Sequence, residues 1–276
     1  MNNFITSTSH IPTMNPKSNG PTEPVNIVTL KWGTRYGAEY VNKLFASVSR
    51  NITLPFHFIC FTDDDEGLTE GITSFPIPEM ELDPPMLYKP WRKLCLFKEG
   101  LPLSGFCLFL DLDVVITGNL DDFFFFEPGK IPIIYDWPTF ARKLFPKGPP
   151  VGNSSVFRFV ANKNTFVYEQ FLREKEWALA NFRPPQSYLT HCIRPQMAFW
   201  PKHWVASFKE HCLPRWPLNL FKTARLPKRA KIVIFHGRPD PDDARDGKWP
   251  LGKKASWKKI YKYTKPTPWI EEYWRE

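Results

Sequence analysis

Largely apolar runs alternate with a stretch of helical periodicity in the first half of the chain. Val25–Leu30, Phe56–Phe61 and Phe106–Leu110 are short apolar runs bounded by polar residues. Such runs are typical of strands buried on both faces, as in a parallel sheet. Between the first two, apolar residues recur at helical spacing and predict an amphipathic helix over 38–50. The alternation of strand and helix predicts an α/β fold.

The same patterns organise the rest of the chain. Residues 91–98 and 186–193 have helical character, while 131–135 and 231–235 are apolar enough for strands. Residues 1–24 are polar, lack the apolar core of a signal peptide, and predict a disordered N-terminal tail. We therefore expect one domain over 25–250, followed by a C-terminal tail over 251–276 in which Trp, Tyr and Lys alternate.

Two aspartates at the end of the most apolar strand are the main chemical signal. Asp111 and Asp113 directly follow Phe106–Leu110, and a second apolar run follows them. Charged carboxylates at such a place require compensation, for which a divalent cation is the usual partner. A metal or phosphate role competes with a structural role in a turn. The acidic run 63–66 is followed by Gly67 and polar residues, which favours a solvated turn.

The loop after the first strand combines cations, aromatic rings and glycine. Trp32 or Tyr36 could stack on a nucleotide base, and Lys31 or Arg35 could contact a phosphate. The alternative is that the rings only cover the sheet edge. No G-x-G-x-x-G motif is present, so the loop alone indicates nucleotide binding weakly.

Later segments add a histidine and several small polar residues. His236 ends an apolar strand and is followed by Gly237, which allows a ligand to approach the backbone. With the two aspartates it would form a donor set that suits manganese or magnesium. Asn153 and Ser154 precede another apolar segment, where they could hydrogen-bond a polyhydroxylated ligand or form an ordinary turn.

Composition narrows the class of protein. The chain has 276 residues, a net charge of +9, and much of its cationic excess follows Arg225. Five cysteines without C-x-x-C spacing fit reduced core thiols in a cytoplasmic compartment, and make a zinc site improbable. No apolar run approaches the roughly 20 residues needed to span a bilayer. No nucleic-acid partner is expected.

Taken in order, these motifs resemble a GT-A-fold nucleotide-sugar glycosyltransferase of the small bacterial type, related to the glycogenin and galactosyltransferase-like group. The resemblance runs from about Val25 to Lys248 and depends on the order of the pieces. They are the Thr-Leu-Lys-Trp-Gly loop, Trp91-Arg-Lys-Leu, Leu110-Asp-Leu-Asp, Asn153-Ser-Ser-Val, Gln186-Ser-Tyr and Phe235-His-Gly. The implied fold is a Rossmann-like mixed sheet with flanking helices in a single domain.

The resemblance also implies roles for individual residues. Asp111, Asp113 and His236 would hold Mn²⁺ or Mg²⁺, which would bridge the diphosphate of a UDP-sugar. Lys93 and Lys209 would approach the donor phosphates. Residues lining the nucleoside pocket would be Thr29, Lys31, Trp32, Gly33 and Tyr36. Residues facing the sugar and acceptor would be Asn153, Ser154 and Gln186.

One position departs from the family pattern. An acidic residue usually precedes the glutamine at Gln186, and here Pro185 stands there. The carboxylate near the reacting carbon is then missing unless Asp136 or another residue replaces it. Retention of anomeric configuration is favoured, because inversion needs a base that deprotonates the acceptor. The acceptor would be a glycan, a glycolipid or a protein, met in the cytoplasm or at the inner face of the membrane.

Two other readings remain open from the sequence. Asp111-Leu-Asp113-Val-Val matches the opening motif of haloacid-dehalogenase-type phosphatases, although that family places it near the N-terminus. A non-enzymatic module that binds polyanions or a membrane surface would use the net charge and the basic aromatic tail over 251–276. That module would leave the two aspartates after a buried strand unexplained.

Overall fold

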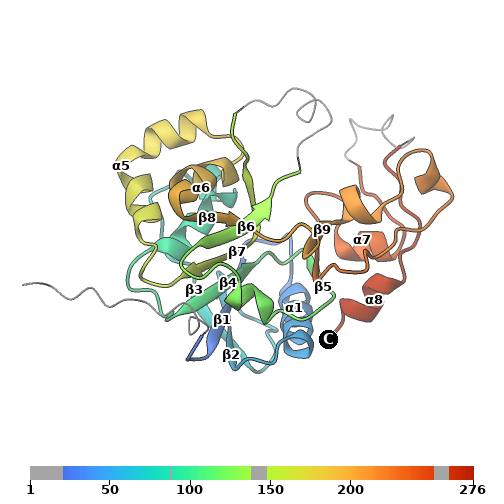
Figure 1. Cartoon of the computed structure of the whole chain (residues 1–276), viewed down its shortest axis with the longest axis horizontal. Coiled ribbons are helices and arrows are strands. Elements are labelled where there is room, and N and C mark those ends of the chain that lie inside the picture. Colours follow the sequence, from blue (N-terminus) through green and yellow to red (C-terminus); the bar gives the residue numbers. More distant parts are fainter. Residues whose placement is uncertain (1–20, 88, 138–147, 252–260) are drawn as a thin grey trace, which may run out of the picture.

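The fold is built on a seven-stranded sheet and a smaller three-stranded sheet (Figure 1). The computed structural model describes residues 21–87, 89–137, 148–251 and 261–276. The predicted N-terminal tail over 1–24 lies outside these residues except for 21–24. The strands are β1 (Val25–Lys31), β2 (Phe56–Thr62), β3 (Ile72–Pro76), β4 (Phe106–Leu110), β5 (Val114–Ile116), β6 (Ile131–Tyr135), β7 (Gly152–Val160), β8 (Met197–Phe199), β9 (Val205–Ser207) and β10 (Ile232–Ile234).

Helices connect these strands, and several of them are short. The α-helices are α1 (Ala38–Asn51), α2 (Pro84–Leu87), α3 (Asp122–Phe125), α5 (Phe166–Asn181), α6 (Gln186–Ile193), α7 (Pro241–Arg245) and α8 (Trp269–Tyr273). The other helical turns are η1 (Pro90–Phe97), η2 (Arg194–Gln196), η3 (Phe208–Cys212) and η4 (Leu218–Leu220). The predicted helix over 91–98 is present as η1, which is a 3₁₀ helix with proline in its first turn.

The large sheet has the order β3-β2-β1-β4-β7-β6-β8 and is mixed. Strands β3, β2, β1 and β4 run parallel, whereas β7 pairs antiparallel with both β4 and β6. The α/β prediction and the mixed sheet are therefore confirmed. Glycine is required where β7 begins, because a Cβ at Gly152 would lie 2.7 Å from the side chain of Ile133.

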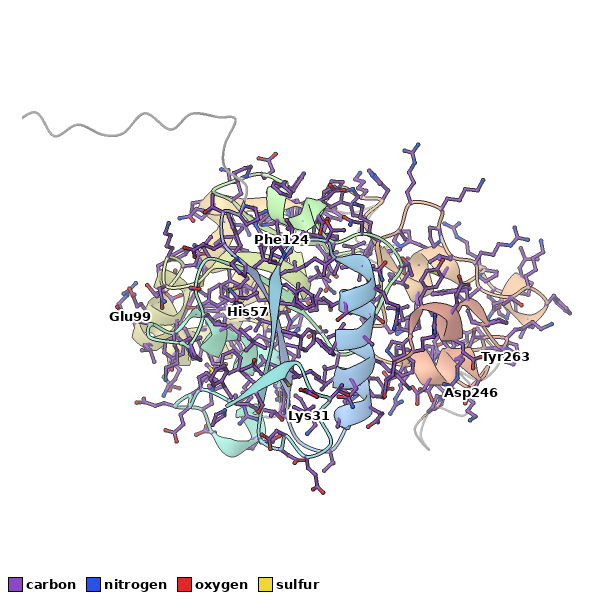
Figure 2. The ribbon with its side chains drawn as sticks, turned by 90° about the horizontal axis from the view of Figure 1, so that it is seen from below. Lys31, His57, Glu99, Phe124, Asp246 and Tyr263 are labelled. Carbon is purple, nitrogen blue, oxygen red and sulfur yellow. The ribbon has the colours of Figure 1, made fainter. Side chains whose placement is uncertain are left out.

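Two apolar layers cover the two faces of the large sheet. One layer joins α1 to α3, α7, α8 and the small sheet, and the other joins η1, α5 and α6 (Figure 1). Figure 2 shows Lys31, at the end of β1, far from Phe124 of α3. The end marked by Lys31 is the carboxyl edge of the parallel strands, where ligands bind in open α/β sheets.

The C-terminal segment is part of the fold where it is described. In α8, Ile270 is fully buried, and Trp274 just beyond it is almost so. The Ser47 hydroxyl of α1 donates to the carbonyl of Tyr273, and the rings of Tyr40 and Trp274 pack edge to face. Residues 261–276 of the basic aromatic tail therefore pack on the domain.

Candidate functional site

Asp111, Leu112 and Asp113 form the link between the two sheets. Strand β4 ends at Leu110, and β5 begins at Val114 and pairs with β10. The amide of Asp111 still donates to the carbonyl of Ser155 on β7. The two carboxylates thus lie where the carboxyl edge of the large sheet meets the small sheet, as expected from their place after an apolar strand.

Asp111 is held by Lys93. The Lys93 ammonium lies 2.7 Å and 2.8 Å from the two carboxylate oxygens of Asp111, and it also donates to the carbonyl of Ser154. Helix η1 places Lys93 there, nearly buried, with its ammonium above the Phe109 ring. Lys93 therefore lies at the predicted site, and its charge is directed at a carboxylate.

Asp113 has a different environment. Burial raises the pKa of Asp113 to about 7, and the neighbouring Asp111 carboxylate adds to the rise. The Tyr36 hydroxyl lies 3.2 Å from Asp113 and 3.2 Å from Asp240. Burial also raises the pKa of Tyr36, so its hydroxyl keeps its hydrogen. One hydrogen can serve only one of these two carboxylates at a time.

Asp240 is a site residue that the sequence did not reveal. Its side chain is almost fully buried and accepts from Arg35 at 3.0 Å, while Arg238 lies 2.6 Å away. Asp240 is also the N-cap of α7 in a reciprocal capping box with Asp243. The sequence signal for that cap, an Asp followed by proline and acidic residues, was present. Its link to Arg35, across more than 200 positions, was not visible.

His236 reaches the aspartates because β10 pairs with β5. The Phe235 amide donates to the carbonyl of Asp113 at 3.0 Å, which fixes the next residue beside the site. The strand before His236 and the strand before the aspartates lie in different sheets, since β10 belongs to the small sheet and β4 to the large one. The positive φ of Gly237 then turns the chain toward α7.

The imidazole of His236 is kept neutral. Its Nε2 lies 2.8 Å from the Ser207 hydroxyl, and its ring stacks on Trp137. Burial lowers the pKa of His236 to about 4, and the nearby Lys209 ammonium contributes. Lys209 itself donates to the His236 carbonyl, and burial lowers the pKa of Lys209 to about 8.

Two adjoining cavities collect most of the predicted residues. The larger, of about 600 Å³, is lined by the loop after β1, and the smaller is about 180 Å³. Both are bounded by Pro90, Lys93, Asp111 and Asp113. The larger adds, among others, Trp32, Gly33, Arg35 and Tyr36. The smaller adds, among others, Asn153, Ser154, Gln186, His236 and Gly237.

Thr29, Lys31 and Lys209 do not line either cavity. The Thr29 hydroxyl donates to the Leu110 carbonyl, and the buried Lys31 ammonium donates to the Asp64 carbonyl. Side chains alternate along a strand, so Thr29 and Lys31 lie on the face opposite Leu30. Leu30 and Trp32 do line the larger cavity. The predicted roles of Thr29 and Lys31 thus gain no support from their placement.

Gln186 lies beside a carboxylate despite Pro185. The Gln186 amide nitrogen is 3.4 Å from an oxygen of Asp136, which follows β6 directly. Asp136 was the residue considered as a replacement for the missing acidic group. The fold therefore places the Asp136 carboxylate beside Gln186, which lines the smaller cavity. The residues next to Gln186 in the sequence do not indicate this neighbour.

The donor types at this site suit a divalent cation, although the side chains are not arranged around one. Asp113 has a raised pKa and, among the described residues, forms no ion pair with a Lys or Arg. Asp111 adds a second carboxylate and His236 a neutral imidazole. Within the described part of the chain, no three His, Cys, Asp or Glu residues are grouped as metal ligands. Asp111 would have to share its contact with Lys93, and His236 its contact with Ser207.

Comparison with solved structures identifies the fold. The chain is similar to the galactosyltransferase LgtC, solved with donor and acceptor sugar analogues: the TM-score is 0.53 and the identity 13%, over 79% of this chain and 89% of that one. It is also similar to the glycosyltransferase GlyE of Streptococcus pneumoniae TIGR4, with TM-score 0.52 and 13% identity, over 79% of this chain and 56% of GlyE. The bifunctional glycosyltransferase WbbM matches with TM-score 0.51 and 10% identity, over 86% of this chain and 50% of WbbM.

At these identities the comparison establishes the fold, which is that of the GT-A glycosyltransferases, as the sequence predicted. The chain matches no protein-family model. A search of curated proteins also finds no match.

Proposed function

We propose that the chain is a metal-dependent glycosyltransferase that moves a sugar from a UDP-sugar to a glycan, glycolipid or protein acceptor. The observation that carries the proposal is the convergence of Asp111, Asp113, His236 and Gln186 on one small cavity. That cavity adjoins a larger one formed by the loop after β1. The fold shared with glycosyltransferases supports this reading over the phosphatase and polyanion-binding alternatives.

The larger cavity would take the nucleoside diphosphate. Trp32 and Tyr36 present rings to this space, Gly33 permits close approach of the backbone, and Arg35 contributes a half-exposed cation. Lys93 lies on the wall common to both cavities, so it could contact the diphosphate while it remains near Asp111. A base stacked on an aromatic ring and phosphates beside cations is the usual mode of nucleotide recognition.

The smaller cavity would hold the transferred sugar. Asn153, Ser154 and Gln186 offer amide and hydroxyl groups for hydrogen bonds to sugar hydroxyls. Asp111, Asp113 and His236 would hold Mn²⁺ or Mg²⁺, which would neutralise the departing diphosphate. His236 suits such a role because its low pKa keeps it neutral at physiological pH.

Retention of anomeric configuration belongs to the proposal. The enzymes that the chain resembles mostly retain configuration, and front-face attack without an enzyme nucleophile tolerates Pro185 at the position where they carry an acidic residue better than inversion, which needs a base for the acceptor. The five buried, unpaired thiols support a reducing, cytoplasm-like compartment as the place of the reaction.

To test the proposal, UDP is titrated into the protein with and without Mn²⁺. Calorimetry measures its binding, and thermal shift measures its effect on stability. A ligand that binds only the folded state raises its apparent stability. We expect UDP to stabilise the protein only when Mn²⁺ is present, and Asp113→Ala to abolish the effect. Asp65→Ala, in the solvated acidic turn, is the matched control. If UDP and other nucleoside diphosphates bind equally well without metal, the proposed role of the aspartates is wrong.

A further inference from the structure

A further cavity lies at the edge of the seven-stranded sheet opposite to the site. It has a volume of about 520 Å³ and is lined where β4 and β6 begin and β7 ends, by Phe106, Ile131 and Val160 among others. The two aspartates of the site follow the other end of β4, so the length of that strand separates them from this cavity. In Figure 2, Lys31 marks the edge at which the site lies. The space at the opposite edge is called the amino-edge cavity.

A buried cation without a carboxylate partner lies behind the wall of this cavity. Arg158 of β7 is fully buried and forms no ion pair with any described residue. Its guanidinium donates to the carbonyls of Phe123, Glu127 and Lys130, while its Nε has no partner in the described part of the chain. Burial lowers the pKa of Arg158 to about 10, because the charged form is poorly solvated there. The three carbonyls therefore compensate this charge only in part.

Two residues connect Arg158 to the amino-edge cavity. The guanidinium carbon lies 5.2 Å from the centroid of the Phe106 ring, and the guanidinium also donates to the carbonyl of Lys130. Both Phe106 and Lys130 line the cavity. The charge of Arg158 is thus one residue away from the cavity, in surroundings that screen it less than water does. An anion in the cavity would be attracted by it.

The polar side of the cavity offers a buried amide and two lysines. Asn164 is 8% exposed, and its Oδ1 accepts from the Val160 amide at 2.8 Å. Its Nδ2 donates to no other described group, so this amide is left for a ligand in the cavity that Asn164 lines. Lys130 and Lys163 also line the cavity and are exposed, without an ion pair to any described residue. Glu23 is the one acidic residue among the described residues that line it.

We propose that the amino-edge cavity binds a small molecule with an apolar body and one anionic group, a carboxylate or a phosphate. The apolar body would contact Phe106, Ile131 and Val160, and the anionic group would accept from Asn164 beside the two lysines. Cavities of about 300–1,000 Å³ with apolar walls and a few polar groups are typical of small-molecule sites. A bare inorganic anion would leave the apolar wall without a contact, so an amphiphilic ligand fits better.

This site is separate from the proposed donor site. The amino-edge cavity shares no lining residue with either of the two cavities beside Asp111 and Asp113. Its ligand and UDP would therefore bind at the same time. The inference does not depend on the proposed transferase activity.

The experiment is a fluorescence titration of the full chain with anilinonaphthalene sulfonate, a dye that combines an apolar ring system with one anionic group. Bound dye is then displaced with octanoate, with octyl phosphate and with neutral octanol. Lys130→Glu/Lys163→Glu reverses the two exposed charges of the cavity. Lys228→Glu/Arg229→Glu makes the same change of net charge at exposed positions outside the cavity and is the matched control. Since all four side chains are exposed, both variants should keep the wild-type melting temperature.

A third variant tests the buried amide. Asn164→Asp keeps an oxygen that can accept from the Val160 amide and replaces the free amide donor by an anion. We expect this variant and Lys130→Glu/Lys163→Glu to bind the dye about tenfold more weakly than the wild type. Lys228→Glu/Arg229→Glu should bind it as well as the wild type. If Asn164→Asp does not fold, the two exposed double variants still decide the question.

In the wild type we expect octanoate or octyl phosphate to displace the dye, and octanol to displace it about tenfold less readily. The better competitor of the two anions identifies the anionic group. UDP with Mn²⁺ should leave the dye bound, because it occupies the opposite edge of the sheet. Equal dye affinity in the two double variants would overturn the proposal. Displacement of the dye by UDP with Mn²⁺, or equal displacement by octanol and the two anions, would overturn it as well.

Discussion

Asp113 and Asp240 are joined through a single hydroxyl group, since the Tyr36 oxygen lies 3.2 Å from a carboxylate oxygen of each. Asp240 also holds Arg35 and Arg238, so its charge is already compensated by two guanidinium groups. Asp113 has no comparable ion pair among the described residues. The hydroxyl hydrogen of Tyr36 is therefore worth more to Asp113 than to Asp240.

The first prediction concerns the charge of Asp240. In Asp240→Asn the side chain can still cap α7, because Asn is as good an N-cap as Asp. Arg35 loses its carboxylate partner, whereas Arg238 keeps its ion pair with Asp243. Arg35 lines the larger cavity, so we expect metal-dependent UDP affinity to fall about tenfold with little change in melting temperature. Calorimetry measures the affinity. Asp246→Asn, next to α7 and outside this network, is the control, and equal affinities of the two variants would contradict the prediction.

The second prediction concerns competition between Lys93 and a metal ion for Asp111. In Lys93→Met the carboxylate loses the ammonium that lies 2.7 Å away. We expect the metal-free variant to melt at a lower temperature, because the partly buried Asp111 charge is left without its partner. Mn²⁺ should then raise the melting temperature more in the variant than in the wild type. Thermal shift with Mn²⁺ and with a chelator measures this, and an equal Mn²⁺ effect in both proteins would count against the competition.

The third prediction assigns chemistry to the carboxylate beside Gln186. Asp136→Asn preserves the shape of the side chain and removes its charge. The larger cavity, in which we propose that UDP binds, is not lined by Asp136. We expect kcat for UDP-sugar hydrolysis to fall about 100-fold, with KM and UDP affinity nearly unchanged. Steady-state kinetics separates the two parameters. If Asp136→Asn changes KM alone, Asp136 acts in binding and not in the chemical step.

The fourth prediction follows from the buried thiols. Burial raises the pKa of Cys60, Cys95, Cys107 and Cys212 to about 12 and that of Cys192 to about 11. In the unfolded chain these thiols ionise near pH 9, so unfolding releases protons above that pH. The stabilisation is fully present below pH 9 and is lost as the pH rises through the folded-state values.

Urea unfolding across alkaline pH measures that loss. Each thiol should lower the free energy of unfolding by about 1.4 kcal/mol per pH unit in this window. Other groups also titrate in this pH range, so the wild type is compared with Cys95→Ala. The free energy of unfolding of the variant should fall less steeply with pH, by the contribution of one thiol. Identical slopes would mean that Cys95 is not protected from ionisation in the folded protein.

The sequence predicted the parts of the site that are marked by local patterns. Asp111 and Asp113 stand out because an apolar run marks the end of a buried strand, and the observed β4 ends one residue before them. The predicted helix over 186–193 and the strand over 131–135 have the observed bounds. These features depend on periodicity within a few residues, which a single sequence displays directly.

Features that depend on distant pairing were not predictable in the same way. Side chains alternate between the two faces of β1, so Trp32 lines the larger cavity and Lys31 does not. Which of the two alternating sets faces the cavity depends on how the rest of the fold covers each face of the sheet. The bond between Arg35 and Asp240 joins two loops that only the completed fold brings together. The pairing of β10 with β5 likewise needed both sheets to be known.

The three-residue link from Asp111 to Asp113 has a mechanical consequence. The backbone of Asp111, Leu112 and Asp113 connects β4 in the seven-stranded sheet to β5 in the three-stranded one. A small rotation of one sheet against the other would change the angle between the carboxylates directly. A ligand that contacts both carboxylates would connect the two sheets, and the ease of this rotation would then depend on whether the smaller of the two site cavities is filled.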